Sequence, residues 1–252
     1  AVVKSPSGSE ITVTQAGDWV LSANPASEVT ARLVLTADTE DFGESFDVSL
    51  EAENSEGVHT LAWDVYVPSE AEQHVAITEF LANPTGNTTA GHYNPLYRET
   101  PSESNFLSVE DEFIEIANLS QADVDMAGWS LSDAVALRSN FYEGDVLAKR
   151  GAAIVYGGRL SGSEPVLDDG ILVLPATEGT SGLGLNNSGD TITLRNADEH
   201  VIDRINFSKT SSKGSMTRDS GLNGAFTDHS TVADASVSAG AWPSGAPFTE
   251  DP

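Results

Sequence analysis

The sequence contains no cysteine, so neither a disulfide framework nor a thiolate metal site can form within the chain. It also has no run of about 18 apolar residues, the length that a membrane-spanning helix needs, and we expect no membrane insertion. Basic residues are scarce: 12 Lys and Arg stand against 39 Asp and Glu, which gives a net charge of −27. Because nonspecific nucleic-acid binding depends on cations that neutralise phosphates, we expect no nucleic-acid partner.

Sequence signatures of catalysis are missing as well. The sequence has no G-x-S-x-G elbow and no H-E-x-x-H zinc motif, and its five histidines are scattered along the chain. Paired carboxylates serve glycoside hydrolysis only when they face each other in a cleft. Glu112 and Glu115 lie on opposite sides of an expected strand, whereas Glu110 and Glu112 share one side, and nothing in the sequence indicates a cleft there. The sequence therefore predicts a protein without enzymatic activity.

The sequence does contain short stretches of period-2 alternation that are separated by turn residues. In the first quarter of the chain such stretches occupy residues 29–37, 45–52 and 57–67. Short strands at this spacing predict an all-β fold built from sandwich-like units. A chain of 252 residues suggests two domains, and the Pro- and Glu-containing stretch 68–72 is a natural linker. We therefore expect a small immunoglobulin-like β domain over residues 1–70 and a second β-sandwich over residues 71–252.

The most informative stretch is residues 112–133, EFIEIANLSQADVDMAGWSLSD. Ile114 and Ile116 point to one side of an expected strand, and Phe113 and Glu115 point to the other. The stretch resembles the signature of the lamin tail domain family, in which an E-W-I-E-L-x-N strand leads into a V-D-L-S-G-W-x-L-S-D strand. The residues that carry this resemblance are Glu112, Ile114, Glu115, Asn118, Val124, Asp125, Gly128, Trp129, Leu131, Ser132 and Asp133.

Other parts of the chain extend the resemblance to about residues 74–248. The opening strand of the family matches at Ile77, Glu79, Phe80, Ala82, Asn83 and Pro84, and its N-x-G-D-x-V-x-L motif matches at Asn187, Gly189, Asp190, Ile192 and Leu194. The resemblance implies an immunoglobulin-like sandwich that buries Trp129 between two sheets and has no assigned catalytic residues. Residues 1–68 resemble, by strand pattern alone, the immunoglobulin-like modules of bacterial surface proteins.

Three features outside the main motifs carry further expectations. Asp203 lies on the same side of a strand as apolar residues, so its carboxylate needs a hydrogen-bond partner and has a structural role. The low-complexity run 230–241 is expected to lie along the surface. Residues 85–110 form a long polar insertion, and loops of this length are often functional.

The insertion supplies the candidate ligand-binding residues. It combines exposed aromatic side chains with a cation, the mixture found in recognition surfaces: Tyr93, Tyr97, Arg98 and Phe106. The alternative is that the aromatic residues fold back and cap an open end of the sandwich.

Calcium is the metal that the composition favours, because it takes hard oxygen ligands from loop carboxylates and carbonyls. The candidate ligands are Asp38, Glu40 and Asp41, which lie in an acidic turn between two strands. No EF-hand pattern is complete, and a solvated acidic turn is the alternative. We therefore expect no cofactor other than calcium.

The leading functional hypothesis is a non-catalytic binding, adhesion or spacer module of a larger secreted bacterial protein, located outside the cell or on its surface. The alternative is a carbohydrate- or polymer-binding accessory module attached to a secreted hydrolase or nuclease. In either case the partner is a protein or a polysaccharide. Exposed strand edges allow side-by-side dimers, and the sequence leaves the oligomeric state open.

Overall fold

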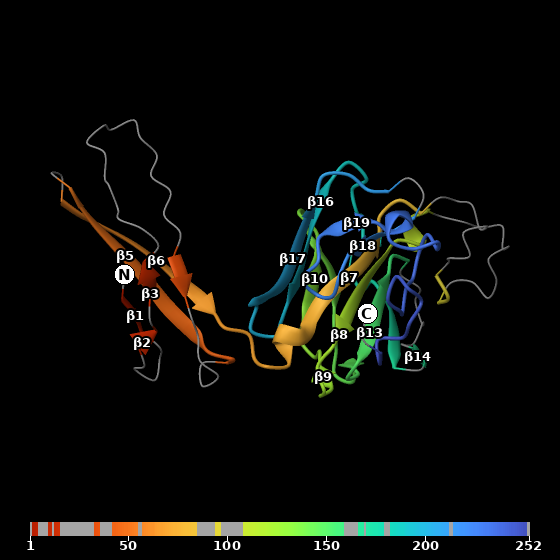
Figure 1. The fold of residues 1–252 in the computed structure, drawn as a ribbon, viewed down its shortest axis with the longest axis horizontal. Helices are drawn as coiled ribbons and strands as arrows, with labels where there is room; N and C mark the ends of the chain where they lie inside the picture. Colours follow the sequence, from red (N-terminus) through yellow and green to blue (C-terminus); the bar gives the residue numbers. More distant parts are fainter. Residues whose placement is uncertain are drawn as a thin grey trace. The chain divides into compact units, whose positions relative to one another are not determined.

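The computed structural model of the protein is drawn in Figure 1. It describes residues 2–4, 10–11, 13–15, 33–35, 42–54, 57–84, 94–96, 108–158, 166–168, 170–178, 182–211 and 214–250. Within these ranges the regular structure is β-strand, joined by single turns of 3-10 helix such as η2 (Glu72–His74), η4 (Ser108–Glu110) and η5 (His229–Thr231). The predicted all-β class is therefore confirmed. No helix in these ranges is long and apolar enough to cross a membrane.

The chain separates into two compact units, Ala1–Glu70 and Ala71–Pro252. In the first unit a four-stranded sheet has the order β2-β1-β5-β6, and β3 pairs with β4. The longest pairing of this sheet is antiparallel, joins its last two strands, and runs from Ser45 opposite Tyr66 to Asn54 opposite Gly57. The strands of this unit are β1 (Val2–Lys4), β2 (Glu10–Ile11), β3 (Val13–Gln15), β4 (Leu33–Leu35), β5 (Ser45–Asn54) and β6 (Gly57–Tyr66).

The second unit is built from two main sheets. The seven-stranded sheet has the order β14-β15-β13-β8-β7-β18-β19, and the four-stranded sheet has the order β11-β10-β16-β17. The first of these contains β7 (Val75–Leu81), β8 (Phe113–Asn118), β13 (Gly151–Tyr156), β14 (Val166–Asp168), β15 (Ile171–Pro175), β18 (Met216–Arg218) and β19 (Phe226–Asp228). The second contains β10 (Ser130–Ser132), β11 (Leu137–Asn140), β16 (Asp190–Arg195) and β17 (Val201–Phe207), while β9 (Val124–Asp125) pairs with β12 (Val146–Leu147).

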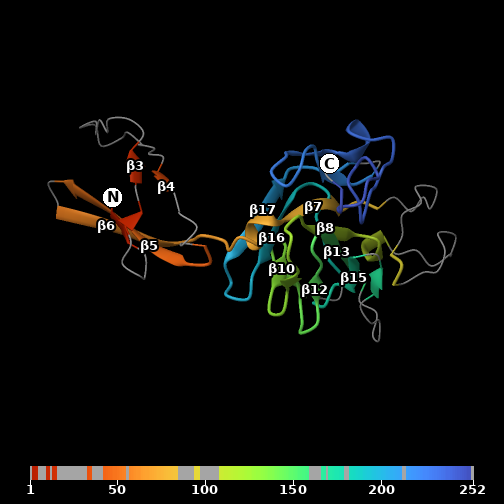
Figure 2. The ribbon, with the colours of Figure 1, turned by 60° about the horizontal axis from the view of Figure 1, so that its bottom comes forward.

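The two sheets of the second unit face each other as the layers of a sandwich (Figures 1 and 2). One continuous apolar core joins Ile114 and Ile116 of the seven-stranded sheet to Leu131, Ile192 and Leu194 of the four-stranded sheet. The indole of Trp129 belongs to the same core and is only 4% exposed, so its predicted burial is confirmed. The alternation of apolar residues along the strands therefore places the interior correctly.

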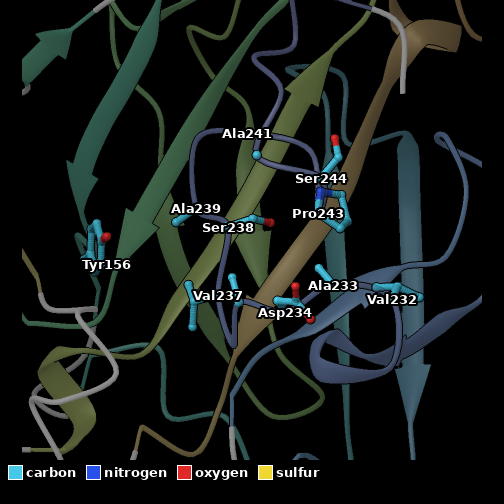
Figure 3. Close-up of a pocket in the computed structure, with 12 residues that line it drawn as sticks. Tyr156, Val232, Ala233, Asp234, Val237, Ser238, Ala239, Ala241, Pro243 and Ser244 are labelled. Atoms are coloured by element: carbon cyan, nitrogen blue, oxygen red, sulfur yellow. The ribbon is translucent and has the colours of Figure 1, made fainter.

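The outer face of the seven-stranded sheet is covered too, and residues 229–241, which we call the strap, provide much of this cover. Val237 and Ala239 of the strap pack on a second apolar cluster that contains Phe113 and Tyr156. Figure 3 shows the strap crossing in front of the strands. The expectation that residues 230–241 lie along the surface is confirmed, since each of them is exposed or half-buried, and Val237 and Ala239 also pack on the sheet beneath them.

An ion pair closes the edge of the sandwich. Asp203 on β17 accepts a hydrogen bond from the backbone N–H of Ile77 at 2.9 Å and another from Nη2 of Arg218 at 2.7 Å. Arg218 also donates through Nε to the carbonyl oxygen of Ile77 at 2.7 Å. The predicted structural role of Asp203 is confirmed, since its carboxylate fastens the four-stranded sheet to β7 and β18.

Candidate functional site

The site residues that the sequence predicts all lie outside the described residues. This applies to the candidate ligand-binding residues Tyr93, Tyr97, Arg98 and Phe106, and equally to the candidate calcium ligands Asp38, Glu40 and Asp41. Both sites stay predictions. In the part of the chain that the structure describes, no group of three or more His, Asp or Glu side chains is placed to hold a metal ion.

The most unusual polar feature of the described structure is a pair of buried carboxylates, Glu79 on β7 and Glu115 on β8. The two residues lie directly opposite each other in the antiparallel pairing of the strands, and each is only 1% exposed. The register shifts between Ile77 and Glu79, which indicates a β-bulge at Thr78. The bulge brings the Thr78 hydroxyl within 2.6 Å of Glu115 Oε1, to which it donates a hydrogen bond.

The strap provides most of the other hydrogen bonds to these carboxylates. Ser238 donates its backbone N–H to Glu79 Oε1 at 3.0 Å and its hydroxyl to Glu79 Oε2 at 2.5 Å. The backbone N–H of Gly240 donates to Glu115 Oε2 at 2.5 Å. Two residues of the strap thus bind two neighbouring carboxylates of the sheet, and this contact explains why a polar sequence can lie on a buried face.

Burial changes the proton affinity of both carboxyls. Loss of hydration, and after it the nearby charge of Glu79, raise the pKa of Glu115 to about 8. Hydrogen bonds from Thr78 and Gly240 oppose this rise. Loss of hydration also raises the pKa of Glu79, while hydrogen bonds from Ser215 and Ser238 and the proximity of His229 oppose that shift. Two carboxylates side by side in a sealed interior resist ionising together, so at neutral pH the pair holds a proton.

His229 lies next to this pair at the start of the strap and is fully buried. Its Nδ1 is 2.8 Å from the carbonyl oxygen of Ala235, which can only accept, so Nδ1 carries a hydrogen. Its Nε2 has no hydrogen-bond partner and lies 3.9 Å from Glu79 Oε2. The ring therefore lies beside Glu79 without a hydrogen bond to it.

A cavity of about 600 Å³ lies over the strap. Its lining is mostly small side chains of residues 232–245, and Tyr156 lines it from β13 (Figure 3). Ser238 lines this cavity and is also hydrogen-bonded to Glu79, so this residue connects the cavity with the buried pair. Ser238 does not form a catalytic triad, because in a triad the imidazole stands between the hydroxyl and the carboxylate, whereas here the hydroxyl donates directly to Glu79.

The chemistry open to this cluster is proton storage and the holding of the strap. General acid and base catalysis requires a substrate within hydrogen-bond reach of the carboxyl groups, and side chains that are 1% exposed cannot offer this while the strap is closed. The sequence did not reveal the pair, because Glu79 and Glu115 are 36 positions apart and meet only through strand pairing. The available signal was that both glutamates fall on matched strand motifs and that Glu115 lies on the side away from Ile114 and Ile116. Alternation alone would place Glu79 on the same side as Ile77, and the bulge at Thr78 changes this.

A second group of motif residues gathers at one end of the sandwich around Arg138. Its guanidinium forms an ion pair with Asp133, 8% exposed, and packs so closely on Gly184 that a Cβ there would lie 2.9 Å from Nη2. Burial tends to raise the pKa of Asp133, but hydrogen bonds from Arg138 and two backbone N–H groups outweigh it and hold the pKa below its usual value. Burial raises the pKa of the neighbouring Glu112 to about 8. These contacts explain, in structural terms, why the family motif has acidic residues at Glu112 and Asp133.

Asn118 has a comparable role at the other end of β8. It is fully buried, and its Nδ2 lies within 3.2 Å of the carbonyl oxygens of Ala122, Leu147 and Ala148, while its Oδ1 accepts from the N–H of Ser120 at 2.9 Å. One side chain thereby fixes the turn after β8 against the segment that follows β12.

Comparison with known proteins agrees with this geometry. No curated protein sequence matches the chain significantly. The family model of the Lamin Tail Domain matches residues 68–209, which is more than half of the chain and includes both sheets of the sandwich up to the end of β17. The strap and strands β18 and β19 lie beyond the matched segment. The chain therefore belongs to the lamin tail domain family.

Proposed function

We propose that this protein is a non-catalytic binding or spacer module of a larger secreted bacterial protein, and that it acts outside the cell or on its surface. Lamin tail domains are immunoglobulin-like modules without enzymatic activity. The observation that carries the proposal is the burial of the paired Glu79 and Glu115 carboxylates, which are each only 1% exposed and so lie out of reach of a substrate. The strongly acidic composition supports an extracellular setting rich in cations.

The experiment has an enzymatic arm and a location arm. The full chain is screened against esterase, phosphodiesterase and glycosidase substrates, beside the Glu79→Gln and Glu115→Gln variants. We expect no turnover above buffer, and turnover that either substitution abolishes would overturn the proposal. In the second arm, an antibody against the protein should label intact producing cells or the culture medium, and labelling only after lysis would refute the location.

The second candidate function is a carbohydrate- or polymer-binding accessory module that uses the 85–110 insertion. Its support is the aromatic content of that insertion, where Tyr93, Tyr97 and Phe106 are suited to stacking on sugar rings. A glycan array distinguishes the candidates, because binding that is lost in Tyr97→Ala favours the accessory module, whereas an array without signal refutes it.

We also propose that calcium is the ion that the acidic turn at Asp38, Glu40 and Asp41 binds. The support is the density of hard oxygen ligands in one short turn of a chain with net charge −27. A bound ion stabilises the state that binds it, so millimolar calcium should raise the melting temperature of the full chain. The shift should be smaller in Asp41→Asn, and a wild-type chain with no shift would refute the proposal.

A further inference from the structure

A small cleft lies beside Tyr142, on the loop between β11 and β12. It has a volume of about 290 Å³ and is lined by this loop on one side and by the end of β15 on the other. The lining residues are Asn140, Tyr142, Glu143, Asp145, Leu174, Pro175 and Thr177. This volume is at the lower limit of ligand sites, so it suits one side chain or one ring rather than a nucleotide or an oligosaccharide.

Tyr142 differs from the other aromatic residues of the second unit. Its side chain is 56% exposed, whereas the other Phe, Trp and Tyr side chains described in residues 71–250 are buried or half-buried. Leu174, which is only 6% exposed, and Pro175 form an apolar wall of the same cleft. A large ring that stays outside the core while apolar atoms lie beside it is typical of a recognition site.

The cleft is held in shape before any ligand arrives. The backbone N–H of Tyr142 donates to Asp145 Oδ2 at 2.7 Å, and the N–H of Asp145 donates back to the Tyr142 carbonyl at 3.0 Å. Two further bonds join this side of the cleft to the segment after β15, because the Asn140 N–H donates to Thr177 Oγ1 at 2.8 Å and its side-chain amide donates to Glu178 Oε1 at 3.0 Å. Such preorganisation lowers the entropic cost of binding.

The charges of the cleft indicate the kind of ligand. Its lining contains two carboxylates, Glu143 and Asp145, and neither lysine nor arginine. The amide donor of Asn140 is already committed to Glu178, so the lining offers acceptors and a π face more readily than donors. A sugar hydroxyl needs donors as well as acceptors, whereas an ammonium or guanidinium group needs only acceptors and is attracted to the face of an aromatic ring.

We propose that this cleft binds one basic side chain, lysine or arginine, of a partner protein. The alkyl stem of the side chain lies along Leu174 and Pro175, and its charged end reaches the Tyr142 ring and the carboxylate of Glu143. The inference rests on the proposed function as a binding module, and it names the partner class as a protein with an exposed basic segment. The net charge of −27 adds long-range attraction for such a segment.

The test measures binding of fluorescein-labelled hexalysine to the full chain by anisotropy at fixed ionic strength, with four variants. Tyr142→Ala should weaken binding about three- to tenfold, as expected for loss of a cation–π contact, whereas Tyr142→Phe should bind like the wild type. Glu143→Gln should weaken binding about two- to fivefold. The matched control Asp198→Asn removes one exposed carboxylate elsewhere and should have a smaller effect than Glu143→Gln. Melting curves confirm that each variant is folded.

Each result decides the proposal. Equal affinities of the wild type and Tyr142→Ala would overturn it, and so would equal losses in Glu143→Gln and Asp198→Asn, because binding would then follow net charge alone. Binding of neutral oligosaccharides that depends on Tyr142, without binding of hexalysine, would assign the cleft to sugars and also overturn it. Enzymatic turnover or an exclusively intracellular location would refute the proposed function independently of the outcome for Tyr142.

Discussion

The two faces of the seven-stranded sheet are buried by different kinds of contact. On the inner face Ile114 and Ile116 meet the apolar residues of the four-stranded sheet, and the contact needs no polar partner. On the outer face Glu79 and Glu115 are buried beside Phe113, and they need donors from a strap that arrives more than 100 residues later in the chain. The inner face therefore depends on close packing, and the outer face depends on hydrogen bonds and proton binding.

The largest effect is expected on the inner face. Ile116→Ala removes a fully buried side chain from the centre of the core and should lower the free energy of unfolding by about 2–5 kcal/mol, because the cavity adds to the lost transfer energy. Denaturant unfolding followed by circular dichroism measures the loss. A loss below about 1 kcal/mol would show that the inner face is less tightly packed than the structure indicates.

The edge between the faces should be the next most sensitive region. Asp203→Ala leaves Arg218 and the Ile77 N–H without their acceptor, and we expect a loss of about 2 kcal/mol, since hydrogen bonds to charged groups contribute roughly this amount. The same denaturant assay measures it. Asp198→Asn, an exposed position, is the matched control and should change stability little. Equal effects of the two substitutions would show that the contacts of Asp203 with Arg218 and Ile77 do not stabilise the fold.

The outer face should differ from the inner face in its pH dependence. Folded Glu115 keeps its proton up to about pH 8, whereas a carboxyl in the unfolded chain ionises near pH 4.5, so between these values the folded state binds more protons. Stability should fall as pH rises through this window, by at most about 1.4 kcal/mol per pH unit for each proton. Melting curves across the window should be flatter for Glu115→Gln than for the wild type.

A control separates Glu115 from the other buried glutamate. The pKa of Glu112, whose carboxylate accepts from the backbone N–H of Leu185 rather than from the strap, is also raised to about 8, so Glu112→Gln should remove its own share of the slope. An Ile116→Ala chain should keep the wild-type slope, because it changes packing only. If Glu115→Gln kept that slope as well, the carboxyl pair would not hold the proton that the buried geometry requires.

The smallest effect is expected for the strap itself. Ser238→Ala removes the hydroxyl that donates to Glu79 but keeps the backbone N–H that donates to the same carboxylate, so we expect a loss of about 1 kcal/mol. Hydrogen exchange should localise the change to the amides of Ser238 and Gly240. Unchanged exchange at both amides would contradict a role of the Ser238 hydroxyl in holding the strap.

The sequence predicts the inner face well and the outer face poorly, for a physical reason. The alternation of Ile114 and Ile116 and the position of Trp129 predict the core, because burial of apolar side chains follows the strand period. The pairing of Glu79 with Glu115 depends on strand register and a bulge, and local periodicity predicts neither of these. The contact of Ser238 joins residues far apart in the chain, which local periodicity cannot predict either. Tyr142 was missed because a single aromatic in a turn has no pattern.

The strap is synthesised late, and this affects the nascent chain on the ribosome. Strands β7, β8 and β13 are synthesised by residue 156, whereas Ser238 and Gly240 emerge about 80 residues afterwards. During that interval Glu79 and Glu115 lack the donors of the strap, so we expect both carboxyls to be hydrated and ionised, and we expect their like charges to discourage other chains from adhering to Phe113 and Tyr156. The same two carboxylates that are difficult to bury in the finished molecule are then expected to protect it while it is still incomplete.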